Sequence, residues 1–410
     1  MLPFLTEHYG NPSAANSPGR RARLAIDESR DQVAEALGCD PGEVVFCSGG
    51  TEAAQIGISG VIAAASRREV AGGSTVCSAI EHPAVLRSVL AAGGTTFRVG
   101  ADGVIDLDAL ASSLNPHVSL VAVMLANNEV GTIQPISAVA DLVRDYSPSA
   151  TLLVDAVHAV PWLNIAEMCA SADMLAVSAH KFGGPKGVGA LVVRCAVTDG
   201  SGSGSRSGTG PRWVPVAHGG AQERERRPGT ENVAGIVGMA AAIAVTTRER
   251  ENAVQRITIL RDHLADSICS SLTGVTETGT VVGFGAGVGA DAGVVAGRLA
   301  VRGGAADRRV ARTSKVAGSC HLVIEGVEQD ELMFLLDSEG VYASAGSACA
   351  SGAAEPSHVL EAMGVSAALA ASSAGYGSTL RLSLGHNTTL AEVEHAASVV
   401  PKVVEHLRAG

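Results

Sequence analysis

The segment Val177–Val193 (VSAHKFGGPKGVGALVV) places two polar side chains between an apolar run and a glycine-rich loop. His180 and Lys181 follow the apolar residues directly, and glycines occupy positions 183, 184, 187 and 189. A buried strand ordinarily ends in turn residues that carry no chemistry, and lysine is among the residues least often buried. We therefore expect a neighbouring group that makes a lysine useful at the end of this strand.

Apolar runs like this one recur along the chain and alternate with helical patterns. The runs predict short buried strands at residues 44–46, 74–77, 120–125, 152–154, 174–177 and 190–193. Helices are expected between several of them, at residues 22–37, 52–65, 83–91 and 136–146. This alternation predicts an α/β fold with a mainly parallel sheet covered by helices on both faces. Sites in such sheets gather where the strands end at their carboxyl edge.

The length of 410 residues is enough for more than one domain. We interpret residues 1–250 as a large domain and residues 251–410 as a smaller α+β domain, with helix expected over residues 233–261. In the smaller domain, strands are expected at residues 321–324 and 379–384, and helices at residues 329–337 and 391–407. Residues 200–210 (GSGSGSRSGTG) predict a flexible surface insertion, whereas the Gly- and Ala-rich segment 279–318 has poor periodicity.

The composition is that of a globular protein, with 46% apolar and 17% charged residues. Acidic residues outnumber basic ones by 41 to 30, and no Lys/Arg stripe is interleaved with aromatics, so nucleic acid is not expected as a partner.

The longest apolar run, residues 233–245, is too short to span a membrane, and the N-terminus lacks a signal-peptide pattern. Eight cysteines without a CxxC pair favour a reducing compartment, and hence the cytoplasm.

The first candidate partner of Lys181 is Asp155, at the end of the apolar run LLVD. A carboxylate in that position is costly unless a positive group lies beside it. A lysine that forms a Schiff base and a buried aspartate that keeps a ring nitrogen protonated together indicate pyridoxal phosphate. The alternative is that Asp155 caps a helix and Lys181 lies on the surface.

A phosphate site is predicted where the run CSGGTEA (residues 47–53) follows a strand and opens a helix. Small residues and a helix N-terminus favour an anion, with Gly50 and Thr51 donating hydrogen bonds. Ser178 and His180 are candidates to complete the site from the other loop. The alternative is an ordinary turn, and neither a Walker-type loop nor a GxGxxG fingerprint favours a nucleotide.

Two further polar clusters follow apolar strands. His82, in AIEHP (residues 79–83), is a candidate to stack on the cofactor ring and to move protons near neutral pH. Asn128, in ANNEVG (residues 126–131), is a candidate to bind cofactor or substrate through hydrogen bonds. The alternatives are a structural histidine and an ordinary loop asparagine.

Two residues in the last part of the chain are candidates for substrate chemistry. Cys349 lies in ASAGSACASG (residues 343–352), where small neighbours leave its thiol little shielded, as expected of a reactive cysteine. Arg381 lies within the predicted strand TLRLSL, where its guanidinium needs an anion. A substrate carboxylate bound bidentately would supply that anion.

Taken together, these motifs resemble the cysteine desulfurases of the NifS/IscS type. The resemblance runs in order along nearly the whole chain, through GNPS, SGGTE, EHPAVL, NNEVGT, VDAVHA, SAHKFGGPKGVGAL, RRPGTENV, SAGSACASG and LRLSLG. It implies the aspartate-aminotransferase-like fold (fold type I) of the class V aminotransferase-like pyridoxal-phosphate enzymes.

The resemblance implies that Lys181 forms a Schiff base with the cofactor, that Asp155 pairs with the pyridine nitrogen and that His82 stacks on the ring. The phosphate would be held by small and polar residues, namely Gly50, Thr51, Ser178 and His180. Thr230, in RRPGT, would reach the phosphate of the neighbouring subunit, which implies an obligate homodimer.

The resemblance also implies the reaction. Asn128 and Arg381 would bind the carboxylate of L-cysteine, and Cys349 would take the substrate sulfur as a persulfide while L-alanine leaves. The sulfur would pass to an acceptor, such as an iron–sulfur scaffold or a tRNA-thiolation protein. No metal site is expected in the chain itself, and Cys349 would at most share a cluster held by a scaffold partner.

Three departures from the family pattern bear on these expectations. The chain starts after the family's first strand and its Ala-Thr-Thr-Pro-like loop, so the expectation is either a start assigned too far downstream or a truncated copy. His158 stands where the family usually has Gln near the phenolic oxygen of the cofactor, so it is included among the cofactor-binding candidates. Residues 200–210, 287–317 and 366–377 look longer or looser than the family pattern.

Two other functions stay open from the sequence. A selenocysteine lyase would share every motif except the dependence on the thiol of Cys349. A truncated, non-catalytic paralogue would instead dimerise or occupy a sulfur-acceptor protein without turnover. A selenocysteine lyase could stay active after the change Cys349→Ala, whereas a desulfurase could not. A colourless protein with an intact dimer would favour the non-catalytic paralogue, because the bound cofactor is yellow.

Overall fold

The structure is a computed structural model that describes residues 1–67, 73–194, 213–279, 312–346, 357–370 and 374–409. The chain divides into two compact units. The first unit contains residues 1–98, 105–125 and 134–250, and the second contains residues 99–104, 126–133 and 251–410. Each unit has its own sheet, and each is described separately below.

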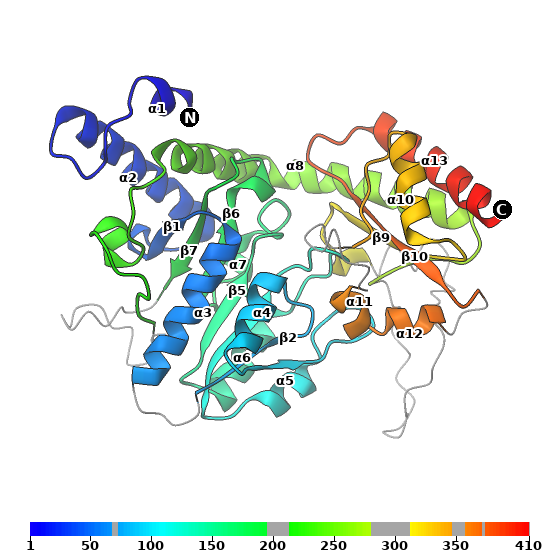
Figure 1. The fold of residues 1–410 in the computed structure, drawn as a ribbon, viewed down its shortest axis with the longest axis horizontal. Helices are drawn as coiled ribbons and strands as arrows, with labels where there is room; N and C mark the ends of the chain where they lie inside the picture. The colour runs from blue at the N-terminus through cyan, green and yellow to red at the C-terminus, as the bar shows by residue number, and fades with distance from the viewer. Residues whose placement is uncertain (68–72, 195–212, 280–311, 347–356, 371–373, 410) are drawn as a thin grey trace. The chain divides into compact units, whose positions relative to one another are not determined.

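The first unit is built on a seven-stranded sheet with the order β1-β7-β6-β5-β4-β2-β3 (Figure 1). Its strands are β1 Val44–Cys47, β2 Ser74–Ser78, β3 Thr95–Phe97, β4 Val118–Met124, β5 Thr151–Asp155, β6 Met174–Ser178 and β7 Gly189–Val193. Neighbours from β6 to β3 pair in parallel, and β7 is antiparallel to both β6 and β1. The predicted mainly parallel α/β sheet is therefore confirmed, and only the short strand β3 was not expected.

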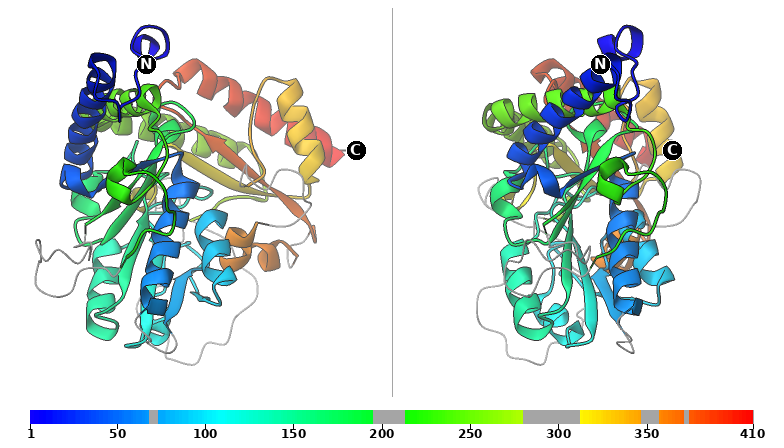
Figure 2. Two further views of the ribbon diagram at one scale, coloured as in Figure 1. Left: turned by 60° about the vertical axis from the view of Figure 1, so that its left-hand side comes forward. Right: turned by 90° about the vertical axis from the view of Figure 1, so that its left-hand side faces the viewer.

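Helices cover both faces of this sheet (Figure 2). Their bounds are α1 Leu2–Thr6, α2 Ser17–Leu37, α3 Gly50–Arg67, α4 Pro83–Ala91, α5 Leu107–Ser113, α6 Ile136–Tyr146 and α7 Ile165–Met168, with 3-10 turns η1 Pro41–Glu43, η2 Ala179–Phe182 and η3 Gln222–Glu225. Helix α8 (Val233–Ser271) belongs to the first unit up to Arg250 and to the second from Glu251. All four helices expected between the strands are present, whereas α1, α5 and α7 were not expected.

Helix α3 packs closely on the sheet because glycines occupy its contact face. A Cβ at Gly57 would lie 2.5 Å from Cδ1 of Leu153, and one at Gly60 would lie 2.0 Å from Nε1 of Trp213. Trp213 is only 2% exposed and donates its indole N–H to the carbonyl oxygen of Ile56 at 3.0 Å. This packing sets the depth of α3 on the sheet, and with it the place of the first turn of the helix beside the end of β1.

A buried ion pair covers the outer edge of β1. Arg30 of α2 donates two hydrogen bonds, of 2.9 and 2.7 Å, to the carboxylate of Glu223 in η3, and neither side chain is more than 5% exposed. Glu223 also accepts the N–H of Phe46 at 2.8 Å, and Arg30 donates to the carbonyl oxygen of Val44 at 2.6 Å. The pair therefore forms hydrogen bonds with the backbone N–H and C=O groups at the edge of β1, which a further strand could otherwise pair with. It also holds residues 223–225, whose φ angles of 48°, 58° and 64° are costly for non-glycine residues.

Replacing Glu223 with Gln should destabilise the first unit by about 3–5 kcal/mol, because the charge of Arg30 stays buried without its counter-ion. Urea denaturation of the variant and the wild-type protein measures the difference. The matched control is Asp141→Asn, which breaks an ion pair with Arg144 whose two side chains are 63% and 62% exposed. That control should cost no more than about 1 kcal/mol. Equal losses in the two variants would contradict the structural role of the buried pair.

The second unit contains a three-stranded antiparallel sheet with the order β10-β9-β8. Its strands are β8 Val275–Glu277, β9 Ser319–Glu325 and β10 Gly377–Ser383, and its other elements are η4 Arg312–Ser314, α10 Gln329–Ser338, α11 His358–Ala362, α12 Val365–Ala370 and α13 Leu390–Ala409. Helices α10 and α13 pack against each other beside this sheet (Figure 1). The strands and helices expected at residues 321–324, 329–337, 379–384 and 391–407 are confirmed.

Residues 126–133 join the second unit through backbone hydrogen bonds that the sequence did not predict. Ile133 donates its N–H to the carbonyl oxygen of Ser314 at 2.8 Å, and Val316 donates to Gly131 at 2.9 Å. Thr132 and Lys315 form an isolated antiparallel bridge between these two backbone contacts. Asn128 therefore belongs to the second unit, although the strand that precedes it lies in the first.

A buried charge network ties β8 to η4 in the second unit. The carboxylate of Glu277 accepts hydrogen bonds from Arg312 at 2.7 Å and from Lys315 at 3.2 Å. Burial tends to raise the pKa of Glu277, but the two cations outweigh burial and hold that pKa below its ordinary value. Glu277 is therefore ionised, which compensates the charges of Arg312 and Lys315 in the interior.

Several predictions fall on parts of the chain that the structure does not describe. The insertion expected at residues 200–210 lies there, as do residues 280–311 and Cys349. Among the described residues, none of the helices has the length and hydropathy that a bilayer-spanning segment needs.

Candidate active site

Polar residues of the first unit gather where the parallel strands end. Ser48 and the start of α3 follow β1, His82 follows β2, Asp155 is the last residue of β5, and Ser178 is the last residue of β6. Lys181 lies three residues further on, in η2. This edge is where sequence analysis placed the site, because parallel strands bring their carboxyl ends together.

Asp155 is a buried carboxylate that would be stabilised by a cation. Its side chain is 8% exposed, and its Oδ1 accepts the N–H of Val157 at 2.9 Å. Burial raises its pKa to about 6, against the combined effect of the Val157 hydrogen bond and the charge of Lys181. A protonated ring nitrogen placed against this carboxylate would supply the compensating charge.

The raised pKa of Asp155 predicts a pH dependence of stability in the cofactor-free protein. The pKa of Asp155 is 3.8 in the unfolded chain and about 6 in the folded protein. Its contribution to stability is complete below pH 3.8, where the group is protonated in both states, and it is lost as the pH rises through about 6. The loss amounts to about 3 kcal/mol. An Asp155→Asn variant cannot ionise, so we expect it to gain stability relative to wild type between pH 4 and pH 7, measured by denaturation of both apo-proteins. A difference that does not change with pH would contradict the burial of an ionising Asp155.

Lys181 is held by a short 3-10 turn with two buried anchors. Ala179 and Phe182 of η2 are 0% and 4% exposed, and Gly183 ends the turn with a φ of 83°. The Lys181 side chain is exposed, yet its charge lowers the pKa values of both Asp155 and His180. The backbone at Lys181 is therefore fixed, and its amine is near enough to Asp155 for its charge to oppose the effect of burial on the pKa of that carboxyl group.

Glycines let neighbouring segments pack closely around the start of α3. A Cβ at Gly50 would lie 2.6 Å from Cγ2 of Val157, and one at Gly189 would lie 2.7 Å from Cα of Gly49. The first N–H groups of an α-helix have no partner inside the helix, so the start of α3 can donate to a phosphate from residues that include Gly50 and Thr51.

Ser178 lies next to this glycine cluster. Its Oγ is 3.5 Å from the position that a Cβ on Gly49 would occupy, and it forms a hydrogen bond of 2.9 Å with Nδ1 of His180. Burial, followed by the charges of Lys181 and Lys186, lowers the pKa of His180, so its ring is neutral at pH 7. A neutral imidazole and a hydroxyl can both donate a hydrogen bond to a phosphate oxygen. The structure thus brings together the four residues predicted to hold the phosphate.

His82 caps α4 and is oriented by its own backbone. Its Nδ1 accepts the N–H of Ala84 at 3.1 Å, which requires that this nitrogen carry no proton. The proton of the neutral ring therefore lies on Nε2. Half-buried and fixed in this way, the ring has the defined orientation that stacking on a cofactor requires.

Glu81, beside His82, was given no role in the sequence analysis. It is fully buried, and its Oε1 accepts the N–H of Met124, at the end of β4, at 2.8 Å. Burial raises its pKa well above the ordinary value, the Met124 hydrogen bond opposes this, and the charge of Asp155 raises it further. Glu81 is therefore harder to ionise than an ordinary carboxyl group, and its hydrogen bond joins the ends of β2 and β4. The sequence did contain a signal for Glu81, because this carboxylate lies only a few residues after the apolar run of residues 74–77.

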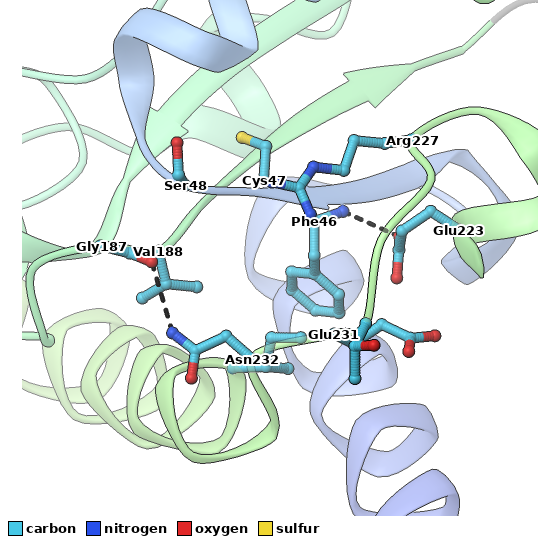
Figure 3. Close-up of a pocket in the computed structure, with 11 residues that line it drawn as sticks. Phe46, Cys47, Ser48, Gly187, Val188, Glu223, Arg227, Glu231 and Asn232 are labelled. Carbon is cyan, nitrogen blue, oxygen red and sulfur yellow. Dashed lines mark hydrogen bonds between the residues drawn. The ribbon is translucent and has the colours of Figure 1, made fainter. Parts of the chain in front are cut away.

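His158 follows Asp155 by three residues at the same end of β5, and Thr230 lies in the loop before α8. His158 is half-buried in the turn that follows β5. Thr230 is exposed and lines a pocket of about 140 Å³. Ser48, Arg227 and Asn232 line the same pocket and are labelled in Figure 3. Asn232 borders the pocket by donating from Nδ2 to the carbonyl oxygen of Gly187 at 3.4 Å.

Asn128 and Arg381 are brought together in the second unit. Nη1 of Arg381 donates to the backbone carbonyl oxygen of Asn128 at 3.1 Å. The backbone of Arg381, in β10, exchanges two hydrogen bonds with Ser344, of 2.7 and 3.2 Å. These contacts fix the direction of the guanidinium beside Asn128. The two residues predicted to bind the substrate carboxylate are therefore neighbours.

Glu129, which follows Asn128, was also missed by the sequence analysis. It is 1% exposed, and its Oε2 accepts the hydroxyl of Ser357 at 2.6 Å. Ser357 in turn caps α11, since its Oγ accepts the N–H groups of Val359 and Leu360. This buried contact anchors the start of α11 to the segment that carries Asn128.

The comparisons with known proteins agree with this arrangement. The profile of the aminotransferase class-V family matches residues 1–281 and 305–395. The chain belongs to this family. It is 34% identical over 415 residues to the cysteine desulfurase IscS of Dictyoglomus turgidum, covering 100% of this chain and 91% of that protein. It is 37% identical over 407 residues to the IscS-like cysteine desulfurase of Mycobacterium tuberculosis, covering 97% and 90%.

Solved structures lead to the same family. A NifS-like protein superposes with a TM-score of 0.78 and 28% identity, over 99% of this chain and 94% of that one. DndA from Streptomyces lividans superposes with a TM-score of 0.69 and 27% identity, over 93% and 94%. The class-V aminotransferase fold and the recognised family are therefore confirmed.

Pyridoxal phosphate is the cofactor of this family, and the residues of the first unit fit it. Asp155 offers a buried carboxylate to a ring nitrogen, and Lys181 offers an amine to an aldehyde. The start of α3 offers helix N–H groups to a phosphate. Among the described residues, no cluster of three or more His, Cys, Asp and Glu side chains is arranged to hold a metal ion.

Proposed function

We propose that this chain is a cysteine desulfurase that converts L-cysteine to L-alanine and transfers the sulfur to Cys349. The observation that supports it most is the buried Asp155 carboxylate at the strand ends, whose pKa burial raises to about 6 against the opposing charge of Lys181. The relatives of the chain are named cysteine desulfurases. Residues 1–250 would form the cofactor-binding domain, and residues 251–410 the domain that carries Cys349.

Each residue has a separate task in this proposal. Pyridoxal phosphate, when bound, supplies an electron-accepting ring that makes the substrate Cα–H bond acidic. Arg381 and Asn128 bind and orient the substrate carboxylate. The Lys181 amine accepts the Cα proton. Burial raises the pKa of Glu81 well above its ordinary value, which disfavours a second negative charge beside Asp155. His82 offers its Nε2–H as a second proton carrier.

The sulfur step balances without an external oxidant or reductant. The Cys349 thiolate attacks the substrate sulfur, so an S–S bond forms as the Cβ–S bond breaks. The electron pair of that bond stays on Cβ, which takes up a proton and leaves as the methyl group of alanine. The products are one L-alanine and one persulfide on Cys349, which is then passed to an acceptor thiol.

The remaining features of the proposal concern assembly and partners. Thr230 would reach the phosphate held by a second copy of the chain, so the enzyme would act as a homodimer. Iron–sulfur scaffolds and tRNA-thiolation proteins are the proposed sulfur acceptors. A cytoplasmic setting would keep Cys349 reduced between turnovers.

The proposal is tested by incubating the purified, cofactor-loaded protein with L-cysteine and a thiol reductant. We expect alanine and sulfide to appear in equal amounts, because the reductant releases the persulfide sulfur as sulfide. The control supplies one equivalent of L-cysteine per active site and no other thiol, in which case about one alanine per active site and little free sulfide are expected, because the sulfur stays on Cys349. Absence of alanine in both arms would refute the proposed function.

A further inference from the structure

The helix start proposed for the cofactor phosphate carries a carboxylate of its own. Helix α3 begins at Gly50, and Glu52 lies in its first turn. Its Oε2 accepts the N–H of Ser48 at 2.5 Å, so the carboxylate turns back over the end of the helix. A negative charge in this place competes for the positive helix end and repels an incoming phosphate.

Arg227 neutralises this carboxylate from a distant part of the chain. Its Nε donates to Oε1 of Glu52 at 2.9 Å, and its Nη2 donates to Oε2 at 3.3 Å, which makes a two-pronged ion pair. Both side chains are 28% exposed. Burial tends to raise the pKa of Glu52, but the hydrogen bonds from Arg227 and Ser48 outweigh it and keep Glu52 ionised at neutral pH.

Arg227 also lies on the loop that carries Thr230. Ser48, Cys47 and Arg227 border the same pocket, and Figure 3 shows them on one side of it. Within this loop, Gly229 donates its N–H to Oε1 of Gln222 at 3.1 Å, and Arg226 donates to the carbonyl oxygen of Gly42 at 2.9 Å. The loop is therefore tied down on both sides of the guanidinium, which holds Arg227 against the start of α3.

We propose that Arg227 is a positioning residue that cancels the charge of Glu52 and so allows the start of α3 to accept the cofactor phosphate. The inference rests on the proposed function only in placing the phosphate at Gly50 and Thr51. Arg227 acts through Glu52 and does not need to touch the phosphate itself. The pair also links the helix that would hold one phosphate to the loop proposed to reach the phosphate of the neighbouring subunit.

The test is the affinity of the apo-protein for pyridoxal phosphate, measured by absorbance titration. Arg227→Gln should raise the dissociation constant about tenfold, the effect of one uncompensated charge near a doubly charged phosphate in a partly solvated site. Glu52→Gln keeps an acceptor for Ser48 and should bind the cofactor at least as tightly as wild type. The double variant Arg227→Gln/Glu52→Gln should return to within about twofold of wild type, because neither charge remains.

Two measurements separate electrostatics from damage to the fold. Pyridoxal lacks the phosphate, so its affinity should be the same in wild type and in Arg227→Gln. The defect of Arg227→Gln for pyridoxal phosphate should also shrink when salt is raised from about 0.05 M to 0.5 M, since partly exposed charges are screened. A variant that is merely distorted would lose both ligands and would show little response to salt.

The outcomes distinguish this inference from the proposed function. The inference is wrong if Arg227→Gln binds pyridoxal phosphate like wild type, or if the double variant is as weak as Arg227→Gln. It is also wrong if pyridoxal binding falls by the same factor. If the wild-type apo-protein does not bind pyridoxal phosphate at all, the proposed function fails and the inference fails with it.

Discussion

Changing Lys181 to Ala is expected to abolish covalent attachment of the cofactor and to reduce alanine formation by roughly a thousandfold or more, because one substitution removes both the anchoring amine and the proton acceptor. Wild-type protein treated with borohydride should carry the reduced cofactor on the peptide that contains Lys181. The same peptide of the variant should carry no added mass. Peptide mapping by mass spectrometry and the rate of alanine formation measure the two effects.

The matched control for this prediction is Lys186→Ala. Lys186 is exposed in the loop that follows η2, and its charge acts on His180 as that of Lys181 does. This control should retain covalent attachment and most of the activity. Two results would contradict the proposed chemistry. One is borohydride labelling of Lys186 in place of Lys181, and the other is folded wild-type protein in which no lysine is labelled.

Changing Cys349 to Ala is expected to leave the cofactor in place and to stop sulfur transfer. The physical reason is that the attack requires a thiolate, and other cysteines of the chain are poor sources of one. Burial raises the pKa values of Cys39, Cys47 and Cys169 to about 12. These thiols stay protonated at neutral pH and cannot replace Cys349.

The measurement for this variant combines the cofactor spectrum with a single-turnover assay of alanine. We expect an unchanged spectrum and no alanine above the background without enzyme. Cys39→Ser serves as the control, since Cys39 is a half-buried free cysteine that has no proposed role in the reaction. Full activity in the Cys349→Ala variant would instead favour a lyase that eliminates sulfur without an enzyme thiol.

The strands and most helices were predictable because their signals are local. Residues 174–177 and 152–154 are short apolar runs bounded by turn residues, and both became central strands, β6 and β5. The polar residues just after them, Ser178 and Asp155, reached a common edge because parallel strands share a direction. The phosphate cradle was visible for a similar reason, since two glycines between a strand and a helix leave N–H groups accessible.

Other parts of the site had no local signal. In the sequence, Glu52 looks like an ordinary residue of a predicted helix, because its partner Arg227 lies 175 positions away along the chain. Glu223 reads as a surface residue of the run ERERR, yet it is 4% exposed and bonds Arg30 at the edge of β1. Glu129 was part of a quoted motif, but its contact with Ser357 joins residues more than two hundred positions apart.

The sequence by itself determined the class of fold, the order of its strands along the chain and the chemical types of the residues at the strand ends. These follow from hydrophobic periodicity and turn chemistry, which act over a few neighbouring residues. Only the tertiary structure decided which strands are neighbours, that residues 126–133 pack with the second unit, and which charges are paired in the interior. The physical reason is that an ion pair such as Arg227–Glu52 or Arg30–Glu223 forms only after packing brings distant segments together, and periodicity contains no information about that distance.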